Sequence, residues 1–304
     1  MSNIAFMSPR VSVLMTIYNA GVFLKPALDG LMLQDMPDFE LVAIENGSDD
    51  GSYELLRQYA SDKRVRIIRL EKNIGRTPAL NLALQESRAD LIAILDADDI
   101  SLPSRLRLQA DFFEKNPKTV LLGSWCRFLY KDNMLSATFA PPISHQSLLD
   151  MMSEQNPFVH SSVMYPRRAA LAVGGYPVDF PYAQDFALFL RMVKNLNKIG
   201  GELAMIPEIL TYSRVHGDSL TSSQNGRLEV ARDSLRLFQE ARTLPGLSQN
   251  ARRNGRKTAV RTMIHYATVL RQNGYLRKSL FWRLRAFGSA PIFAMSDPNF
   301  CRLW

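Results

Sequence analysis

Short apolar runs alternate with amphipathic segments along the first half of the chain. The runs are bounded by turn residues and have the length of buried strands, while the segments between them carry apolar residues at helical spacing. The predicted strands are Val11–Thr16, Phe39–Ile44, Val65–Leu70 and Leu91–Leu95, and the predicted helices are Val22–Leu33, Ser52–Ala60 and Pro78–Glu86. This alternation predicts an α/β fold with a mostly parallel sheet that helices cover on both faces.

The pattern becomes less regular after Pro103, which suits the first turn of a helix that ends near Asn116. Further predicted strands are Val120–Leu122, Val159–Met164 and Ile209–Val215, and a further helix is Asp185–Asn195. From Gly226 onward the pattern is helical, with predicted helices at Leu228–Arg242, Ala251–Arg271 and Leu276–Phe287. We therefore expect one α/β domain at residues 1–225 and a helical tail at residues 226–304.

The net charge of +8 is unevenly distributed. Residues 1–225 have 22 Lys or Arg and 25 Asp or Glu, whereas residues 226–304 have 15 and 4. Apolar residues make up 46% of the chain, which excludes a mostly disordered protein. Cys126 and Cys301 form neither a metal-binding spacing nor a disulfide framework, so we expect a reducing compartment. No apolar run could span a bilayer and Met1–Arg10 has no signal-peptide core, so we expect a cytoplasmic protein with a basic tail.

Polar residues follow three of the predicted strands at the point where each strand ends. The segments are Thr16–Asn19, Glu45–Asp50 and Asp96–Asp99. Open parallel sheets bind ligands outside the carboxyl ends of their strands, so we expect the three segments to meet at one edge of the sheet.

The Asp96–Asp99 segment brings three carboxylates together after an apolar strand. Hard divalent cations such as Mg²⁺ or Mn²⁺ bind one or two carboxylates and fill their remaining positions with phosphate oxygens and water. The chain has no glycine-rich phosphate loop of the Gly-x-Gly-x-x-Gly or Gly-Lys-Ser/Thr type. A metal that binds a diphosphate is one interpretation, and an acidic turn that caps the following helix is the other.

Six segments in this order resemble family 2 glycosyltransferases of the GT-A fold, an inverting group that includes many enzymes of bacterial polysaccharide and lipid-linked glycan synthesis. The resemblance runs from Val11 to about Ser222. The segments are Val11–Asn19, Glu45–Gly51, Asn73–Asn81, the metal-binding Asp-x-Asp at Asp96–Asp99, Val173–Tyr176 with Gln184 and Asp185, and Tyr212–Thr221.

The resemblance implies a Rossmann-like GT-A catalytic domain at residues 1–225, with a nucleotide-binding part at about 1–120 and an acceptor-side part at about 121–225. It also implies transfer of a sugar from a nucleoside-diphosphate-sugar to a glycan or polyprenyl-diphosphate-linked acceptor, with Asp185 as the catalytic base and a divalent metal, Mn²⁺ or Mg²⁺, as the electrophile. The implied metal ligands are Asp98, Asp99 and His216. The implied nucleotide-sugar-binding residues are Thr16, Tyr18, Asn19, Glu45, Asn46, Asn73, Gly75, Arg76, Asn81, Asp96, Asp98 and Arg214.

Several of these residues have a structural alternative. Asp185 could instead cap the helix that it begins, and Asp96 could anchor its turn. Arg76 could be an exposed arginine at a helix start, and His216 a structural histidine. The sequence leaves open whether Asp98 or Asp99 binds the metal directly.

The chain departs from the family at Glu45-Asn46, where many members have two aspartates. An aspartate at the second position accepts a hydrogen bond from a uracil N–H, and the amide oxygen of Asn46 can do the same. UDP- or dTDP-sugars are therefore the favoured donors, while guanine is excluded less easily.

The tail combines basic residues with aromatic ones, which predicts a peripheral contact with an anionic membrane surface, on the cytoplasmic face of an inner membrane. A helical bundle packed on the catalytic domain is the alternative. Two other functions remain open: a catalytically silent sugar-nucleotide binder, and a nucleic-acid-binding protein that uses the basic tail. No zinc spacing, helix-turn-helix pattern or RNA-binding motif accompanies the charge, so no nucleic-acid partner is expected.

Overall fold

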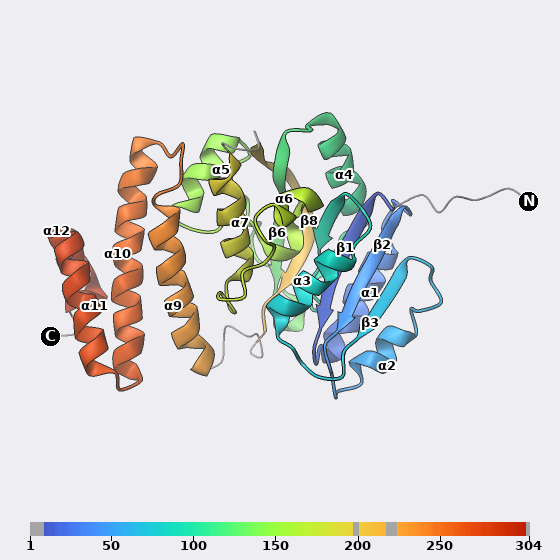
Figure 1. Ribbon diagram of the computed structural model, residues 1–304, viewed down its shortest axis with the longest axis horizontal. Helices are drawn as coiled ribbons and strands as arrows, with labels where there is room; N and C mark the ends of the chain where they lie inside the picture. Colours follow the sequence, from blue (N-terminus) through green and yellow to red (C-terminus); the bar gives the residue numbers. More distant parts are fainter. Residues whose placement is uncertain (1–8, 197–200, 217–223, 302–304) are drawn as a thin grey trace, which may run out of the picture. The chain divides into compact units, whose positions relative to one another are not determined.

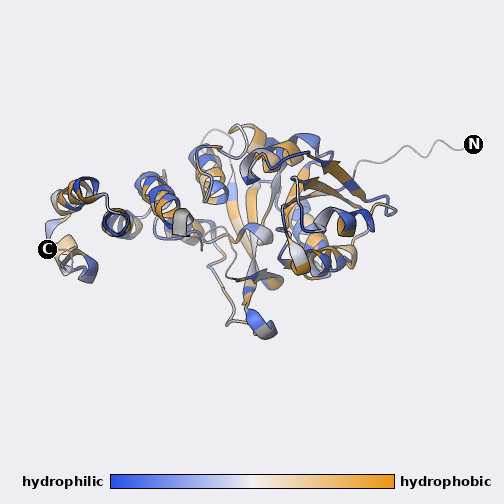
Figure 2. Ribbon diagram, turned by 90° about the horizontal axis from the view of Figure 1, so that it is seen from below, coloured by the Kyte–Doolittle hydropathy of each residue, from blue (hydrophilic) through white to orange (hydrophobic). Residues whose placement is uncertain are grey.

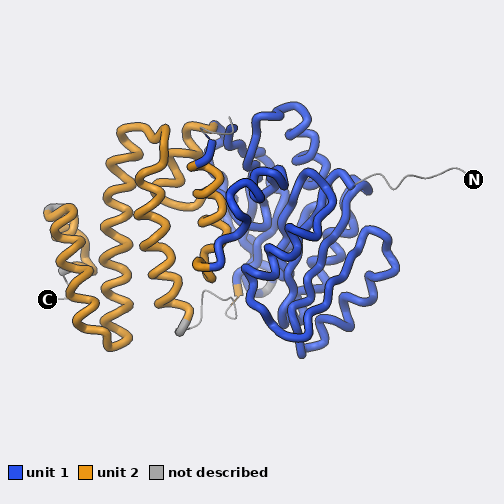
Figure 3. The backbone as a smooth tube through the Cα atoms, in the orientation of Figure 1, with its two compact units in different colours: residues 1–144, 158–178, 195–215 blue, residues 145–157, 179–194, 216–304 orange. Residues whose placement is uncertain are grey.

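The structure is a computed structural model that describes residues 9–196, 201–216 and 224–301. The chain divides into two compact units, and each unit is built from several stretches of sequence (Figure 3). The first unit is residues 1–144, 158–178 and 195–215, and the second is residues 145–157, 179–194 and 216–304. This division differs from a simple cut at residue 225, because residues 145–157 and 179–194 group with the C-terminal helices. The boundary at 225 stays a prediction.

The first unit is built around a mixed sheet with the strand order β3-β2-β1-β4-β7-β6-β8-β5 among the described residues (Figure 1). The parallel half is β1 (Val11–Ile17), β2 (Phe39–Glu45), β3 (Val65–Arg69) and β4 (Leu91–Ile94). The other half is β5 (Ile100–Ser101), β6 (Thr119–Leu129), β7 (Met164–Pro166) and β8 (Glu202–Arg214). Here β7 is antiparallel to β4 and β6, and β8 is parallel to β6. The predicted α/β fold is therefore confirmed.

Helices cover both faces of the parallel half. On one face, alternate residues such as Val13 and Met15 form a core cluster with residues of α1 (Leu24–Met32) and α4 (Arg105–Lys115). The intervening residues, such as Leu14 and Val42, are also fully buried, on the side that α3 (Arg76–Glu86) packs against. The remaining helical segments of this unit are η1 (Gly21–Phe23), α2 (Ser52–Arg57), η2 (Lys131–Asn133), η3 (His160–Ser162) and α6 (Arg167–Leu171).

One predicted strand is wrong. Val159–Met164 reads as an extended apolar run, but its middle is the 3₁₀ turn η3, and β7 begins only at Met164. Both the backbone N–H and the hydroxyl of Ser162 donate hydrogen bonds to the carbonyl of Val159, which closes the turn. The turn directs the side chains of His160 and Ser161 towards the end of β4, where they take part in the site described below.

The second unit is helical among its described residues. Its helices are α5 (His145–Met152), α7 (Gln184–Lys194), α9 (Gln224–Ala241), α10 (Gln249–Gln272), α11 (Leu276–Ser289), α12 (Pro291–Ser296) and α13 (Pro298–Cys301). In this unit α9 packs on α7 and α10, and α10 also packs on α5 and α11 (Figure 1). The helices carry hydrophobic and hydrophilic faces, as Figure 2 shows. No helix in the described part of the chain is long and apolar enough to cross a membrane.

Candidate active site

The first unit brings the three predicted polar segments to one edge of its sheet. β1 pairs in parallel with both β2 and β4, so the carboxyl ends of the three strands point the same way. Thr16 is half-buried near the end of β1, and Tyr18 follows it with 50% of its surface exposed. This arrangement confirms the expected convergence.

Hydrogen bonds link the loop after β1 to the loop after β2. The Asn19 backbone N–H donates to Oγ of Ser48 over 3.1 Å, and the Asn19 side-chain oxygen accepts from the Asp49 N–H over 3.0 Å. The Gly21 N–H donates to the carboxylate of Asp50 over 2.8 Å. Asn19 has a φ of 49°, in the left-handed region that asparagine tolerates better than most residues. Asn19 therefore connects the two loops through its backbone and its side chain.

Asn46 is buried and uses both ends of its amide within the chain. Its oxygen accepts from the Ile74 N–H over 3.0 Å, and its Nδ2 donates to Oδ1 of Asn73 over 3.0 Å and to the Gly75 carbonyl over 3.4 Å. The same Asn73 oxygen accepts from the Gly75 N–H over 2.7 Å. These bonds fix the segment that leads into α3. A contact of Asn46 with a nucleotide base stays a prediction. The base would have to bind the same amide that already forms these three hydrogen bonds.

Glu45 is fully buried at the end of β2. Its Oε1 accepts from the Ser48 N–H over 2.7 Å, and its Oε2 lies 3.6 Å from Nε of Arg69. Next to it, Gly47 has a φ of 77°, and a Cβ at this position would lie 2.7 Å from the Lys72 backbone. Only glycine fits this close approach of the two loops.

A hollow of about 540 Å³ lies beside these loops. Its volume falls in the range of small-molecule sites. The guanidinium of Arg69 lies 3.8 Å from the centre of the Tyr53 ring, which holds the arginine beside the hollow. The sequence did not single out the residues contributed by the end of β3. The lining residues are Gly47, Ser48, Asp49, Arg69, Leu70 and Glu71.

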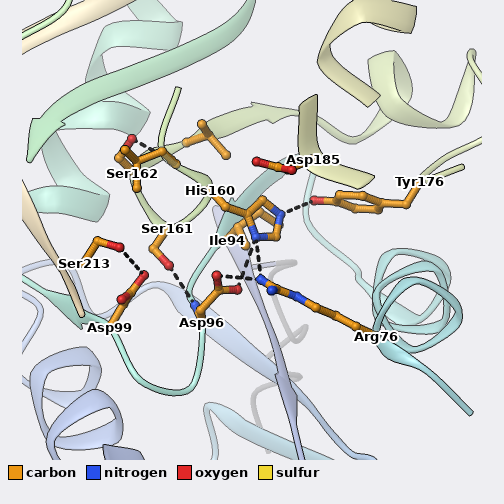
Figure 4. Close-up of polar contacts among 12 residues, drawn as sticks. Arg76, Ile94, Asp96, Asp99, His160, Ser161, Ser162, Tyr176, Asp185 and Ser213 are labelled. Carbon is orange, nitrogen blue, oxygen red and sulfur yellow. Dashed lines mark hydrogen bonds and ion pairs between the residues drawn. The ribbon is translucent and has the colours of Figure 1, made fainter. Parts of the chain in front are cut away.

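Asp96 lies in a polar network at the end of β4 (Figure 4). Its Oδ2 is 2.6 Å from Nη2 of Arg76, and its Oδ1 is 3.2 Å from Nδ1 of His160. Its backbone N–H donates to Oγ of Ser161 over 2.9 Å. Burial by itself would raise the pKa of Asp96, but the charge of Arg76 and the hydrogen bonds from Arg76 and His160 outweigh this effect, and the pKa is lowered. Asp96 is therefore held ionised, and Arg76 is its ion-pair partner rather than a freely exposed side chain.

The network continues from His160 into the protein. Its Nε2 lies 3.1 Å from the hydroxyl of Tyr176, which lies 2.9 Å from the hydroxyl of Tyr165. The side chain of Asn81 forms two hydrogen bonds with the backbone of Tyr176. Its Oδ1 accepts from the Tyr176 N–H and its Nδ2 donates to the Tyr176 carbonyl, each over 2.8 Å. Asn81 thus supports the network from α3. His160 was missed at the sequence level, because it stands in an apolar run far from any motif.

Asp99 is also buried, and strand β8 supplies its partners. Its Oδ1 accepts from the Arg214 N–H over 2.6 Å and its Oδ2 from the hydroxyl of Ser213 over 3.3 Å. The side chain of Arg214 donates from Nε to the Asp98 carbonyl over 3.0 Å, and its guanidinium lies over the Phe23 ring. Arg214 therefore ties β8 to the acidic turn through its backbone and its side chain.

Arg105 is a second cation behind the acidic turn. It is fully buried at the start of α4, and its Nη2 donates to the carbonyls of Ile94 and Val163 over 2.8 and 3.1 Å. Its Nη1 has no hydrogen-bond partner among the described residues. Burial lowers the pKa of Arg105, while the carboxylates of Asp99 and Asp96 act in the opposite direction. The buried positive charge of Arg105 therefore interacts favourably with the carboxylates of Asp99 and Asp96.

The acidic turn has hard oxygen donors that fit a divalent cation. Burial raises the pKa of Asp99, and the negative charges of Asp98 and Asp96 raise it further, so a cation there would relieve the repulsion between the carboxylates. Within residues 9–196, 201–216 and 224–301, no group of three or more His, Cys, Asp or Glu side chains could hold a metal ion. Asp98 or Asp99 could bind such an ion if diphosphate oxygens supplied further ligands.

Two predicted site residues, Asp185 and His216, belong to the second unit. Asp185 lies in the first turn of α7, where Nδ2 of Asn156 donates to its Oδ2 over 3.4 Å. Its carboxylate is only partly buried. His216 follows β8 directly, and the remainder of its predicted motif, at residues 217–221, lies outside the described residues. The structure does not test whether these two residues act with the acidic turn.

Known proteins with a similar sequence identify the class. The family model described as Glycosyl transferase family 2 matches residues 12–173, more than half of the chain. The O-antigen biosynthesis glycosyltransferase WbnJ of Escherichia coli is 29% identical over 239 residues, which cover 77% of this chain and 91% of WbnJ. The UDP-Gal:alpha-D-GlcNAc-diphosphoundecaprenol beta-1,3-galactosyltransferase of Escherichia coli is 28% identical over 191 residues, covering 62% of this chain and 69% of that enzyme.

Solved structures also share this fold. S. aureus TarS 1-349 in complex with UDP-GlcNAc superposes with a TM-score of 0.66 at 16% identity, covering 95% of this chain and 82% of that chain. The mannosyltransferase PcManGT from Pyrobaculum calidifontis, in complex with GDP-Man and Mn²⁺, gives a TM-score of 0.61 at 20% identity, covering 98% and 84%.

The chain belongs to glycosyl transferase family 2. It has the GT-A type of fold that its sequence motifs imply, and it is a glycosyltransferase.

Proposed function

We propose that this protein is an inverting glycosyltransferase of cell-surface polysaccharide synthesis. It moves a sugar from a nucleoside-diphosphate-sugar to a hydroxyl group of a glycan or polyprenyl-diphosphate-linked acceptor. One observation supports this proposal above all. A hollow, an ionised Asp96 and the Asp98-Asp99 pair lie within one unit, at the edge of the sheet where β1, β2 and β4 end.

The donor nucleotide binds at this edge. Its base enters the hollow between the loops after β2 and β3, beside Asp49, Arg69 and Glu71. UDP or dTDP remains the favoured nucleotide. Since the Asn46 amide already bonds to Ile74 and Gly75, we propose that it shapes the base pocket by holding the segment of Asn73 and Gly75, and that backbone groups of the hollow contribute to base selection.

The diphosphate would lie towards the acidic turn, where Asp98 with Asp99 would hold a divalent cation. When bound, Mn²⁺ or Mg²⁺ supplies positive charge to the leaving diphosphate. The residues of the turn act with it: Arg76 keeps Asp96 ionised, and Arg214 fixes the Asp98 backbone. His216 stays a candidate for a further ligand.

Asp185 acts as the base. Its carboxylate takes the proton of the acceptor hydroxyl as that oxygen attacks the anomeric carbon. The new bond forms between the acceptor oxygen and the anomeric carbon, while the bond from that carbon to the phosphate oxygen breaks and the nucleoside diphosphate leaves with the electron pair. Asn156 donates a hydrogen bond to the Asp185 carboxylate, which orients it for this task.

The names of two relatives support a glycan or lipid-linked acceptor. WbnJ is named for O-antigen biosynthesis, and the galactosyltransferase relative is named for an acceptor joined to diphosphoundecaprenol. A lipid-linked acceptor would present its sugar at a membrane surface, which suits the basic tail.

Calorimetric titration with UDP, dTDP, GDP and CMP, each with Mn²⁺ and with EDTA, tests the donor site. We expect one nucleoside diphosphate to bind in a metal-dependent way, and Asp98→Asn to abolish that dependence. Asp99→Asn is a second variant with an added structural effect, because Asp99 also accepts hydrogen bonds from Arg214 and Ser213. Its thermal unfolding midpoint should fall, whereas that of Asp98→Asn should change little.

The alternatives give different results. A silent sugar-nucleotide binder would bind the nucleotide without turning over any nucleotide sugar. A nucleic-acid-binding protein would bind none of the nucleotides and would retard DNA or RNA at physiological salt. Absence of binding under every condition would remove the donor-site assignment.

A further inference from the structure

Helix α11 presents a stripe of large apolar side chains that the described part of the chain leaves uncovered. Their exposed fractions run from 40% for Phe287 to 64% for Leu276. Leu276, Leu280, Leu284 and Phe287 recur at intervals of three or four residues, which places them on one side of the helix. We call this surface the α11 stripe: Leu276, Leu280, Phe281, Leu284 and Phe287.

A neighbouring face of α11 packs within the second unit. Its buried residues are Ser279, Arg283 and Ala286, and Ala286 belongs to a core cluster with Ile264 of α10 and Ala294 of α12. α10 lies between α9 and α11 (Figure 1). The stripe is thus not the packing surface of the helix, although Phe287 keeps one stacked contact with Phe300.

Cationic side chains flank the stripe on the same helix. Arg277, Lys278 and Arg285 are exposed. Lys278 lies over the Tyr275 ring and Arg285 over the Trp282 ring, so their stems lie along apolar surface while their charged heads remain in solvent. Between Gln249 and Cys301 the sequence has ten Lys or Arg and a single acidic residue, Asp297. The stripe therefore stands in strongly positive surroundings.

These charges indicate which kind of partner binds the α11 stripe. A second copy of this chain, bound through the same stripe, would bring two cationic helices together with one acidic residue on each side to compensate. A nucleic acid would use the cations but would leave five exposed Leu and Phe side chains without a role. A bilayer that contains anionic lipid matches both features, because its headgroups attract the cations and its acyl region takes up the apolar side chains.

We propose that the α11 stripe docks the protein on an anionic membrane surface. The helix lies along the surface, with its apolar residues at the boundary between headgroups and acyl chains and with Arg277, Lys278 and Arg285 at the phosphate level. This inference deepens the proposed function, since a surface-bound enzyme would meet an acceptor whose diphosphate sits at the same interface.

Co-sedimentation of the full chain with vesicles tests the proposal. Vesicles of phosphatidylcholine with phosphatidylglycerol should bind the protein, and vesicles of phosphatidylcholine alone should bind it far more weakly. Two variants separate the contributions: Leu280→Gln/Leu284→Gln removes apolar surface, and Arg277→Gln/Lys278→Gln removes charge. Each cation near an anionic leaflet contributes about five-fold to partitioning, so the second variant should bind about 25-fold more weakly.

Arg253→Gln/Arg256→Gln is the matched control. It removes the same charge from exposed positions on α10, which carry no apolar stripe, and it should bind within a few-fold of the unaltered chain. Nucleotide binding by calorimetry should be the same in all these variants. Loss of vesicle binding with intact nucleotide binding therefore isolates the stripe from the donor site, and a chain that binds vesicles but no nucleotide would contradict only the proposed function.

Three results would overturn the proposal. Both α11 variants could bind anionic vesicles as well as the unaltered chain does. The control could lose as much affinity as Arg277→Gln/Lys278→Gln, which would make binding a property of net charge alone. Light scattering could show that the unaltered chain is a dimer and that Leu280→Gln/Leu284→Gln is a monomer, which would assign the stripe to a second copy.

Discussion

The carboxylates of the acidic turn depend on arginines that lie outside the turn, on the helices α3 and α4. Asp96 is joined by Arg76 from the start of α3, and Arg105 approaches from the buried side of α4. An isolated buried carboxylate would be strongly destabilising, so the cations allow the three aspartates to share one turn. Residue type alone does not show that Arg76 and Arg105 contact this turn, since each contact forms only when the helices pack on the sheet.

Arg105→Met should destabilise the protein by about 3 kcal/mol, because it removes a buried cation and leaves the carbonyls of Ile94 and Val163 without their donor. Urea unfolding at pH 7 measures this loss. Arg107→Met is the control. Arg107 lies two residues further along α4 and pairs with Asp35 at an exposed position, so its loss should destabilise the protein far less than the loss of Arg105. Equal losses in the two variants would mean that Arg105 has no special role.

The helices and strands were largely predictable, because apolar periodicity reflects burial directly. β1, β2 and α10, for example, lie within a few residues of the predicted bounds. Strand β6 extends well beyond Val120–Leu122, because pairing with β8 along its length sustains an extended backbone whose side chains are less uniformly apolar. The turn η3 was read as a strand because its hydrogen bonds to the end of β4 are tertiary contacts that the local pattern does not encode.

The acidic turn, the loops after β1 and β2, and Asn81 could be found because they follow strands or belong to motifs. His160 could not, because it contacts the site from an element that the sequence pattern does not connect with it. Arg105 could not, because its burial against the carbonyls of Ile94 and Val163 is a tertiary contact. Asn46 was expected to face a ligand, but its amide bonds to the segment before α3. Residue type shows that a side chain can make a hydrogen bond, whereas its partner depends on the fold.

Helix α9 holds the segment that leads into α7. Arg236 donates to the Asp179 carbonyl over 2.7 Å, and its guanidinium lies 3.9 Å from the centre of the Phe180 ring. Asp233 accepts from the Tyr182 N–H over 3.2 Å, and burial raises the pKa of its carboxyl. Since Asp185 stands in the first turn of α7, these contacts set the position of the proposed base.

Arg236→Ala should lower kcat about ten-fold while leaving the KM for the nucleotide sugar within two-fold, because a small displacement of the base slows proton transfer without touching the donor. Steady-state kinetics with a lipid-linked or glycan acceptor measures both constants. Arg227→Ala, at an exposed position near the start of the same helix, is the matched control and should behave as the unaltered enzyme. A rise in KM with an unchanged kcat would contradict a role in placing Asp185.

The two compact units are interleaved along the chain. Residues 145–157 and 179–194 belong to the second unit, although they precede β8 of the first. A chain that ends at Asn225 would therefore lose α9 and α10, the packing partners of α7 and α5, and would expose apolar residues such as Phe186, whose ring lies 5.6 Å from that of Phe238.

We expect such a shortened chain to be digested rapidly within residues 145–157 and 179–194, and to aggregate at concentrations where the full chain stays dispersed, because buried apolar surface becomes exposed. Limited proteolysis with mass spectrometry, together with light scattering, measures both effects. Protection of these two segments equal to that in the full chain would show that α5 and α7 fold without the C-terminal helices.

The interleaving also sets an order of events during synthesis. When α7 has just been synthesised, α9 has not yet been made, and at about 5 to 20 residues per second the ribosome needs a few seconds to reach Ala241. During that interval Phe186, which packs against Phe238 of α9 in the finished protein, lacks this partner. We therefore expect the nascent chain to bind chaperones that recognise apolar segments. The second unit can fold completely only after all residues of the first unit have been synthesised.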